Sequence, residues 1–241
     1  MVSNVITAMS NSIKHTLTGN QKLYKQNLYN SNPFMVVTGP AGSGKTMLAC
    51  GYALERLKNK DVEKIVLTRP TITVDNENIG FLPGDMQEKM NPYMVPIYDY
   101  LRTSKENDIS SAILSNVEIC PLAFSRGRTF DNCIIIADEM QNATKSQLMT
   151  LMTRIGHGSK MIITGDLMQQ DIEDTVQSGM DYLIKKIKKE YIYTEPSDKR
   201  VWYDNERSWL HIDGLIDVIE FNNSDIKRNE KLSEIIELFQ N

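Results

Sequence analysis

Residues 39–46 of the chain read Gly-Pro-Ala-Gly-Ser-Gly-Lys-Thr, and this stretch decides the fold. It matches the pattern G-x-x-x-x-G-K-[ST] and lies between an apolar run at residues 34–38 and a segment with helical spacing at residues 47–57. A strand, a glycine-rich turn and a helix, in that order, are the context in which this pattern cradles the phosphates of a nucleotide. A chance glycine-rich turn is the alternative, but four constrained positions make it rare. The sequence therefore predicts a phosphate-binding loop (P-loop).

Each residue type in this loop has a physical role. Glycines let the backbone wrap tightly around phosphate oxygens, and the loop amides with the helix N-terminus supply partial positive charge. Lys45 is expected to reach the β and γ phosphates, and the Thr46 hydroxyl to ligate Mg²⁺. The predicted ATP-binding residues of the loop are Gly39, Pro40, Ala41, Gly42, Ser43, Gly44, Lys45, Thr46 and Met47.

The rest of the chain alternates short apolar runs with helix-length segments. This alternation predicts an α/β fold in which a parallel sheet has helices on both faces. The expected strands are residues 34–38, 64–68, 117–120, 133–137, 160–164 and 215–221, and the expected helices include residues 144–154 and 177–189. We expect residues 70–84 to form a loop and residues 85–115 to form two helices.

Capping residues and breaks in pattern indicate the domain organisation. Thr18 with Gln21, and Thr144, have the sequence context of helix caps, and Ser224 is expected to cap a terminal helix. The polar residues 1–16 are expected to be partly ordered. Residues 17–241 are expected to form a single P-loop domain, with a hairpin-like insertion at about residues 190–213.

A second apolar run, residues 133–137, ends in two acids. Asp138 at the strand tip is expected to hold Mg²⁺, directly or through water, and Glu139 to orient the attacking water. The alternative is a plain buried strand with a solvated end. The P-loop upstream argues against this alternative, because a P-loop needs an acidic partner. Gln169 follows another strand and is expected at the same edge, because ligands in open α/β sheets lie beyond the carboxyl ends of the strands.

Composition bounds the partners and the compartment. The net charge is −4, which argues against a general electrostatic grip on nucleic acid. The chain has neither a membrane-length apolar run nor a signal-peptide pattern, so a cytoplasmic protein without membrane contact is expected. The three cysteines and three histidines lack metal-ligand spacing. Cys50 and Cys133 are expected in the core.

Further motifs carry a family resemblance. They are GFLPGD at residues 80–85, RGRTF at residues 126–130 and DEMQN at residues 138–142. With the P-loop they resemble the PhoH-like ATPases, whose core is similar to the first RecA-like domain of superfamily 1 helicases. The resemblance covers roughly residues 17–190 and resumes near residues 215–239. It implies a Mg-dependent ATPase that acts on or with RNA or single-stranded DNA, and a ring-shaped homo-oligomer, most simply a hexamer. The chain's compactness suits a phage-encoded or minimal bacterial version, so the compartment would then be the host cytoplasm.

The resemblance also implies individual roles. Gln21 matches a glutamine that reads adenine, while Gln141 and Gln169 match positions that couple phosphate state to the nucleic-acid face. Arg228 matches an arginine finger supplied to a neighbouring subunit, although the His-Pro that follows it in the family is missing here. Arg154 is the competing finger.

Three arginines follow predicted strands and are candidates for contact with a nucleic-acid backbone: Arg69, Arg126 and Arg128. Nearby Phe124 or Phe130 could stack on a base. The alternative is that these arginines pair with nearby acids and fix the loops.

Two other functions are compatible with the motifs. A thymidine-kinase-like nucleoside kinase also pairs a P-loop with an acid motif, although such kinases usually carry CxxC zinc pairs and this chain has none. A non-hydrolysing, ATP-gated scaffold is the other alternative, and Glu139 argues against it.

Overall fold

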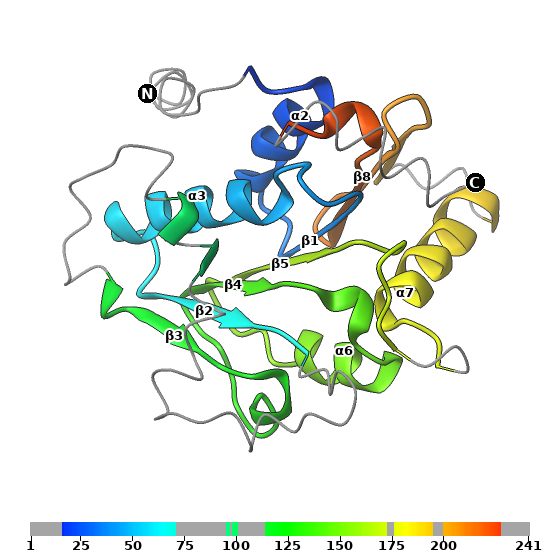
Figure 1. Ribbon diagram of the computed structural model, residues 1–241. Helices are drawn as coiled ribbons and strands as arrows, with labels where there is room; N and C mark the ends of the chain where they lie inside the picture. Colours follow the sequence, from blue (N-terminus) through cyan, green and yellow to red (C-terminus); the bar gives the residue numbers. More distant parts are fainter. Residues whose placement is uncertain are drawn as a thin grey trace.

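A single mixed sheet organises the protein. The structure is a computed structural model. It describes residues 16–70, 95–96, 98–100, 114–172, 176–194 and 200–227. The strands are β1 (Phe34–Thr38), β2 (Lys64–Thr68), β3 (Val117–Ile119), β4 (Cys133–Ala137), β5 (Lys160–Gly165), β6 (Val201–Asp204), β7 (Trp209–Ile212) and β8 (Ile216–Glu220). They form one sheet in the order β3-β2-β4-β5-β1-β8-β7-β6 (Figure 1).

The six strands from β3 to β8 in this order run parallel, so their carboxyl ends share one edge. At the centre of the sheet, Val36 of β1 lies opposite Ile163 of β5 and Val218 of β8. Only β7 and β6 are antiparallel, and they add a hairpin beyond β8. The hairpin occupies the region in which the sequence predicts an insertion.

Helices cover both faces of the sheet (Figure 1). The helices α2 (Gly19–Leu28) and α3 (Lys45–Lys58) pack on one face against side chains such as Val37, Leu67 and Ile136. The helices α6 (Lys145–Met152) and α7 (Gly179–Lys188) pack on the other face against the alternate residues, such as Val36 and Ile135. Successive side chains of a strand point to opposite faces of the sheet. A strand made only of apolar residues is therefore expected where helices cover both faces. The predicted fold class, an α/β sheet flanked by helices, is confirmed.

The caps agree with the sequence in two of three cases. Thr18 and Thr144 each form a capping box, with Gln21 and Gln147 as the reciprocal partners. The prediction for Ser224 is wrong. Asn222 caps a short 3₁₀ turn, η6 (Asn223–Asp225), because its side chain accepts a hydrogen bond from the backbone N–H of Ser224. Ser224 therefore lies inside the turn and does not cap it.

Element boundaries differ by a few residues from the expectations. The strand expected at residues 117–120 ends at Ile119, and the strand expected at residues 215–221 spans Ile216–Glu220. Beyond α7, the chain continues through a π-helix, η5 (Lys189–Thr194). The N-terminal segment, the loop at residues 70–84, most of residues 85–115 and the helix expected after Ser224 lie outside the described residues.

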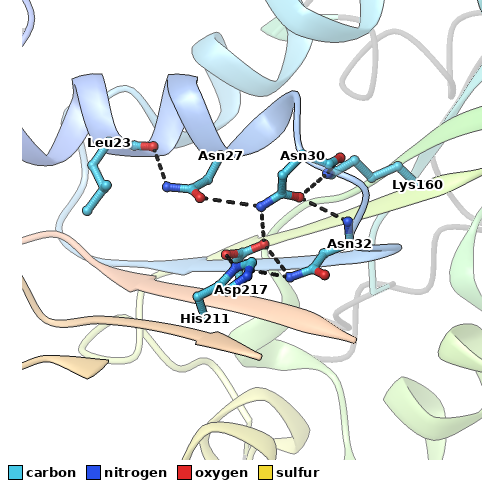
Figure 2. Close-up of polar contacts among 7 residues, drawn as sticks. All are labelled: Leu23, Asn27, Asn30, Asn32, Lys160, His211 and Asp217. Carbon is cyan, nitrogen blue, oxygen red and sulfur yellow. Dashed lines mark hydrogen bonds and ion pairs between the residues drawn. The ribbon is translucent and has the colours of Figure 1, made fainter. Parts of the chain in front are cut away.

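A buried polar network joins the amino-terminal edge of the sheet to α2 (Figure 2). The carboxylate of Asp217 on β8 is fully buried and accepts hydrogen bonds from Asn30 and Asn32, each at 2.8 Å. Its other oxygen lies 2.7 Å from Nδ1 of His211 on β7. Lys160 on β5 donates to the backbone and side-chain oxygens of Asn30, at 2.9 and 3.0 Å. The network therefore fastens the hairpin and three strand starts together.

This network makes stability depend on pH. Burial lowers the pKa of Lys160 from 10.5 to about 8, against the opposing effect of Asp217 and with a smaller contribution from Arg56. Between these two values the unfolded chain binds more protons than the folded one, so stability rises with pH. The expected gain between pH 8 and 9.5 is about 1.5 kcal/mol. Urea unfolding of wild type and Lys160→Met at both pH values checks this, because only wild type should show the gain. If the free energy of unfolding rose equally between the two pH values in both proteins, the assignment of the pH dependence to Lys160 would be wrong.

Candidate nucleotide-binding site

The P-loop connects β1 to α3 and has the backbone that its glycines predict. Gly39, Gly42 and Gly44 have φ values of 145°, 79° and 86°, where side chains are strained. Space is also limited at Gly39, since an added Cβ would lie 2.5 Å from Cβ of Phe221. Gly39 donates its amide to the carbonyl of Gly165 on β5, at 3.2 Å. The loop is thereby fixed to the carboxyl edge of the sheet.

Lys45 opens α3 and points back over the loop. Its Nζ donates to the carbonyl oxygens of Gly39 and Pro40, at 2.7 and 2.9 Å, and the residue is 8% exposed. The ammonium is thus held inside the bend of the loop. Contact of Lys45 with the β and γ phosphates stays a prediction.

Asp138 is joined directly to the P-loop. Its Oδ1 accepts hydrogen bonds from Thr46 at 2.9 Å and from Thr164 on β5 at 2.6 Å. These contacts follow from strand order, because β4 is separated from β1 only by β5. The acid strand and the P-loop therefore meet at one edge.

Glu139 has a strained backbone and a supported side chain. Its φ of 56° and ψ of 34° lie in the left-handed region, which is uncommon for a non-glycine residue and costs of order 1 kcal/mol or more. Gln141 donates to its carboxylate at 2.8 Å and to the carbonyl of Gln169 at 3.0 Å. The same Gln141 amide accepts the Asp166 backbone N–H at 3.1 Å. Gln141 therefore links the acid pair to the loop after β5.

The residues present suit a magnesium ion bound together with nucleotide phosphates. The Thr46 hydroxyl and the Asp138 carboxylate are hard oxygen donors that lie 2.9 Å apart. Among the described residues, no group of three or more His, Cys, Asp or Glu side chains could hold a metal ion. A metal at Thr46 and Asp138 would accordingly take its other ligands from phosphate and water, as Mg²⁺ commonly does.

Gln21 braces the P-loop. Its Nε2 donates to the carbonyl of Ser43 at 2.8 Å and to that of Asp225 at 3.0 Å, and its Oε1 accepts the Thr18 N–H. The residue is 3% exposed. Reading adenine stays a prediction, and it would require Gln21 to exchange these bonds for bonds to the base.

A cavity of about 800 Å³ opens beside the P-loop at the ends of β1, β5 and β8. Gln169 lines it together with Asp166, Met168 and Phe221. The Gln169 side chain is exposed, so it is available to a ligand in this cavity, as expected from its place after β5.

Of the two finger candidates, the structure places Arg154 alone. Arg154 follows α6, and its carbonyl accepts the N–H of Phe130, which precedes β4. Arg154 therefore lies at the amino-terminal edge of the sheet, opposite the P-loop, and does not join the site of its own chain. Arg228 lies outside the described residues.

The proposed nucleic-acid residues divide into buried and exposed ones. Phe130 is fully buried, so its expected role in base stacking is wrong, and Arg128 lies over its ring. Arg128 also pairs with Glu118. Gln141 is 1% exposed and is linked to the acids rather than presented at the surface. Phe124, at 69% exposed, and Arg126 remain accessible.

Sequence reasoning missed three neighbours of Asp138. Arg69, placed in a nucleic-acid rim by the sequence, instead pairs with Asp138 at 2.9 Å. Thr68 is the last residue of β2, and Thr164 is the last but one of β5. The available signal was a threonine that follows an apolar run near the carboxyl end of a strand. Cys50, buried under the site, has its pKa raised by burial and by the charge of Asp138, so it is a core residue and no reactive thiol.

Comparisons with known proteins agree with this arrangement. The PhoH-like protein family model matches residues 13–195. A PhoH-like protein of Bacillus subtilis is 39% identical over 210 residues, which are 86% of this chain and 58% of that protein. A PhoH-like protein of Synechocystis is 44% identical over 144 residues, 59% of this chain and 44% of that protein. The chain thus spans about half the length of these relatives.

A solved structure, the large terminase of a thermophilic bacteriophage, has the same fold type. Its TM-score is 0.51 at 10% identity, and the match covers 92% of this chain and 50% of that one. No helix within the described part of the chain is long and apolar enough to cross a bilayer. The P-loop follows β1, and the acid pair follows β4, with one strand between them. With this arrangement and the extent of the sequence match, the chain belongs to the PhoH-like protein family.

Proposed function

We propose that this protein is a Mg-dependent ATPase that binds ATP on the P-loop and hydrolyses it with Asp138 and Glu139. The hydrogen bond of 2.9 Å between Thr46 and Asp138 carries the proposal. Thr46 and Asp138 are the two residues that would hold Mg²⁺, and this bond places their oxygen atoms next to each other. Mg²⁺, when bound, would neutralise charge that develops on the phosphates during transfer.

The side chains have distinct tasks in this reaction. Lys45, already held within the loop, binds the β and γ phosphates. Glu139 accepts a hydrogen bond from the attacking water and orients it in line with the γ-phosphorus. Gln141 keeps the Glu139 carboxylate in place through its bond at 2.8 Å.

Phosphate release measures the proposal directly. Wild type should release phosphate from ATP with Mg²⁺, and Lys45→Ala should fall to the background, because the loop then loses its charge on the β and γ phosphates. Lys58→Ala, at the far end of α3, is the matched control and should keep wild-type turnover. Phosphate transfer to nucleosides in place of water would favour the kinase. Silence with ATP under every nucleic acid tested would favour the scaffold.

We further propose that RNA or single-stranded DNA is the partner, at the exposed Phe124 and Arg126 beyond β3. An aromatic ring beside a cation suits a stacked, negatively charged strand. Turnover measured with and without single-stranded RNA tests this, since the partner should stimulate it and Phe124→Ala with Arg126→Ala should remove the stimulation.

Self-assembly into a ring, most simply a hexamer, would place an arginine of one subunit at the site of the next. Arg154 lies at the edge of the sheet opposite its own P-loop, which suits donation to a neighbour, and Arg228 is the other candidate. Light scattering with ATP and Mg²⁺ tests the assembly, and a monomer would count against it.

A further inference from the structure

The second oxygen of the Asp138 carboxylate is held by a cation. Arg69, immediately after β2, places Nη2 at 2.9 Å from Oδ2 of Asp138 and at 3.9 Å from Oε1 of Glu139. The Arg69 side chain is 27% exposed and that of Asp138 is 12% exposed. One guanidinium therefore reaches both acids of the site from a strand that contributes no other charge to it.

A small cavity lies beside this ion pair. Its volume is about 10 Å³, roughly the room that one water needs. It is lined by the polar residues Thr46, Thr68, Arg69 and Asp138 and by the apolar residues Cys50, Leu67, Pro96 and Ile136. Thr68 is 2% exposed, and its hydroxyl has no hydrogen-bond partner among the described groups of the protein. A ligand oxygen in this cavity would meet the Thr68 hydroxyl beside the carboxylate that Arg69 pairs with. The space next to Asp138 is thus small, and the Thr68 hydroxyl is one of the few polar groups that face it.

Charge makes the position of Arg69 consequential. Thr46 and Thr164 use Oδ1 of Asp138, and Arg69 uses Oδ2, so the three donors together engage both carboxylate oxygens. A divalent cation beside Thr46 and Asp138 would lie close to the guanidinium and be repelled by it. The same guanidinium offsets the mutual repulsion of Asp138 and Glu139.

We infer that Arg69 is a positioning residue for the acid pair and that it competes with the divalent cation for Asp138. It holds both carboxylates beside the P-loop in the absence of nucleotide, and it raises the metal concentration that the empty site requires. The metal then binds well only together with the phosphates, which supply further ligands and negative charge. The inference rests on the proposed function and assigns Arg69 a task different from contact with nucleic acid.

Metal binding without nucleotide tests this independently of turnover. Mn²⁺, which takes similar oxygen ligands and is visible by electron paramagnetic resonance, is titrated into wild type, Arg69→Met and Arg69→Lys. Arg69→Met should bind Mn²⁺ up to about tenfold more tightly, because the repulsion between a unit charge and a divalent cation several ångströms away is about that large at the dielectric constant of water, and salt reduces it. Arg69→Lys keeps the charge and should stay within about threefold of wild type.

The controls separate this inference from the proposed function. Arg207→Met removes an exposed arginine in the turn between β6 and β7 and should leave Mn²⁺ affinity unchanged. A folded Arg69→Met with wild-type Mn²⁺ affinity, or an equal change in Arg207→Met, would overturn the inference. If Arg69→Met does not fold, Arg69→Gln takes its place with the same expected tightening. Absence of phosphate release by wild type would end the proposed ATPase and still leave the Mn²⁺ result readable.

Discussion

Glu139→Gln is expected to bind ATP normally and to release phosphate on the order of 10³-fold more slowly than wild type. Glutamine has nearly the same shape as glutamate, so it should tolerate the left-handed backbone of residue 139 about equally well. It lacks the negative charge that polarises a water molecule. Because Thr46, Lys45 and Asp138 are unchanged, binding of the nucleotide should persist, and the variant should trap ATP.

Two measurements on the same preparation check this result. Phosphate release gives the rate, and equilibrium binding of a fluorescent ATP analogue gives the affinity. Glu206→Gln, in the exposed turn between β6 and β7, removes one carboxylate of the same type away from the site and should match wild type. A Glu139→Gln protein that turns over within about tenfold of wild type would exclude Glu139 as the residue that activates water.

Asp217→Ala is expected to destabilise the fold by about 3–5 kcal/mol, the cost of removing one partner from a buried charged network. The substitution removes the acceptor for Asn30, Asn32 and His211 at once. Of these donors, Asn32 is buried, and Asn30 and His211 are partly buried. It also removes the negative charge that favours the charged form of Lys160. Unpaired donors and a buried cation then add their penalties.

Urea unfolding followed by circular dichroism measures this effect. Asp213→Ala is the matched control, because Asp213 is exposed in the turn that leads into β8 and should change stability by less than about 0.5 kcal/mol. A loss below about 1 kcal/mol in Asp217→Ala would mean that the network in Figure 2 contributes little to stability.

The central strands of the sheet were predictable because they are short, mostly apolar runs with no alternation. Cys133–Ala137 is buried at every position, which is the pattern of a strand covered on both faces. The P-loop and the acids were predictable as well, since their spacing has a chemical reason. Strand order explains how they meet, and no residue pattern in the chain measures that order directly.

The contacts around the acids could not be read from the sequence. Arg69 and Asp138 lie far apart in the chain, and only the neighbouring positions of β2 and β4 bring them together. Gln21 was identified as functional from its resemblance, yet its amide is used by the backbone of Ser43 and Asp225, and a side-chain pattern does not reveal such partners. Burial of Phe130 was hidden for the same reason, because aromatic residues near a strand start suit either environment.

The place of β8 has a consequence for the boundaries of the functional unit. The family match ends at residue 195, before β8 begins, yet β8 pairs along the whole of β1. In a fragment that stopped there, β1 would become an edge strand with unpaired backbone groups. Such a fragment would also lose Phe221, which abuts Gly39, and the Lys227 amide that bonds to Gly42. The residues that match the family model therefore do not include all the residues that support the conformation of the P-loop.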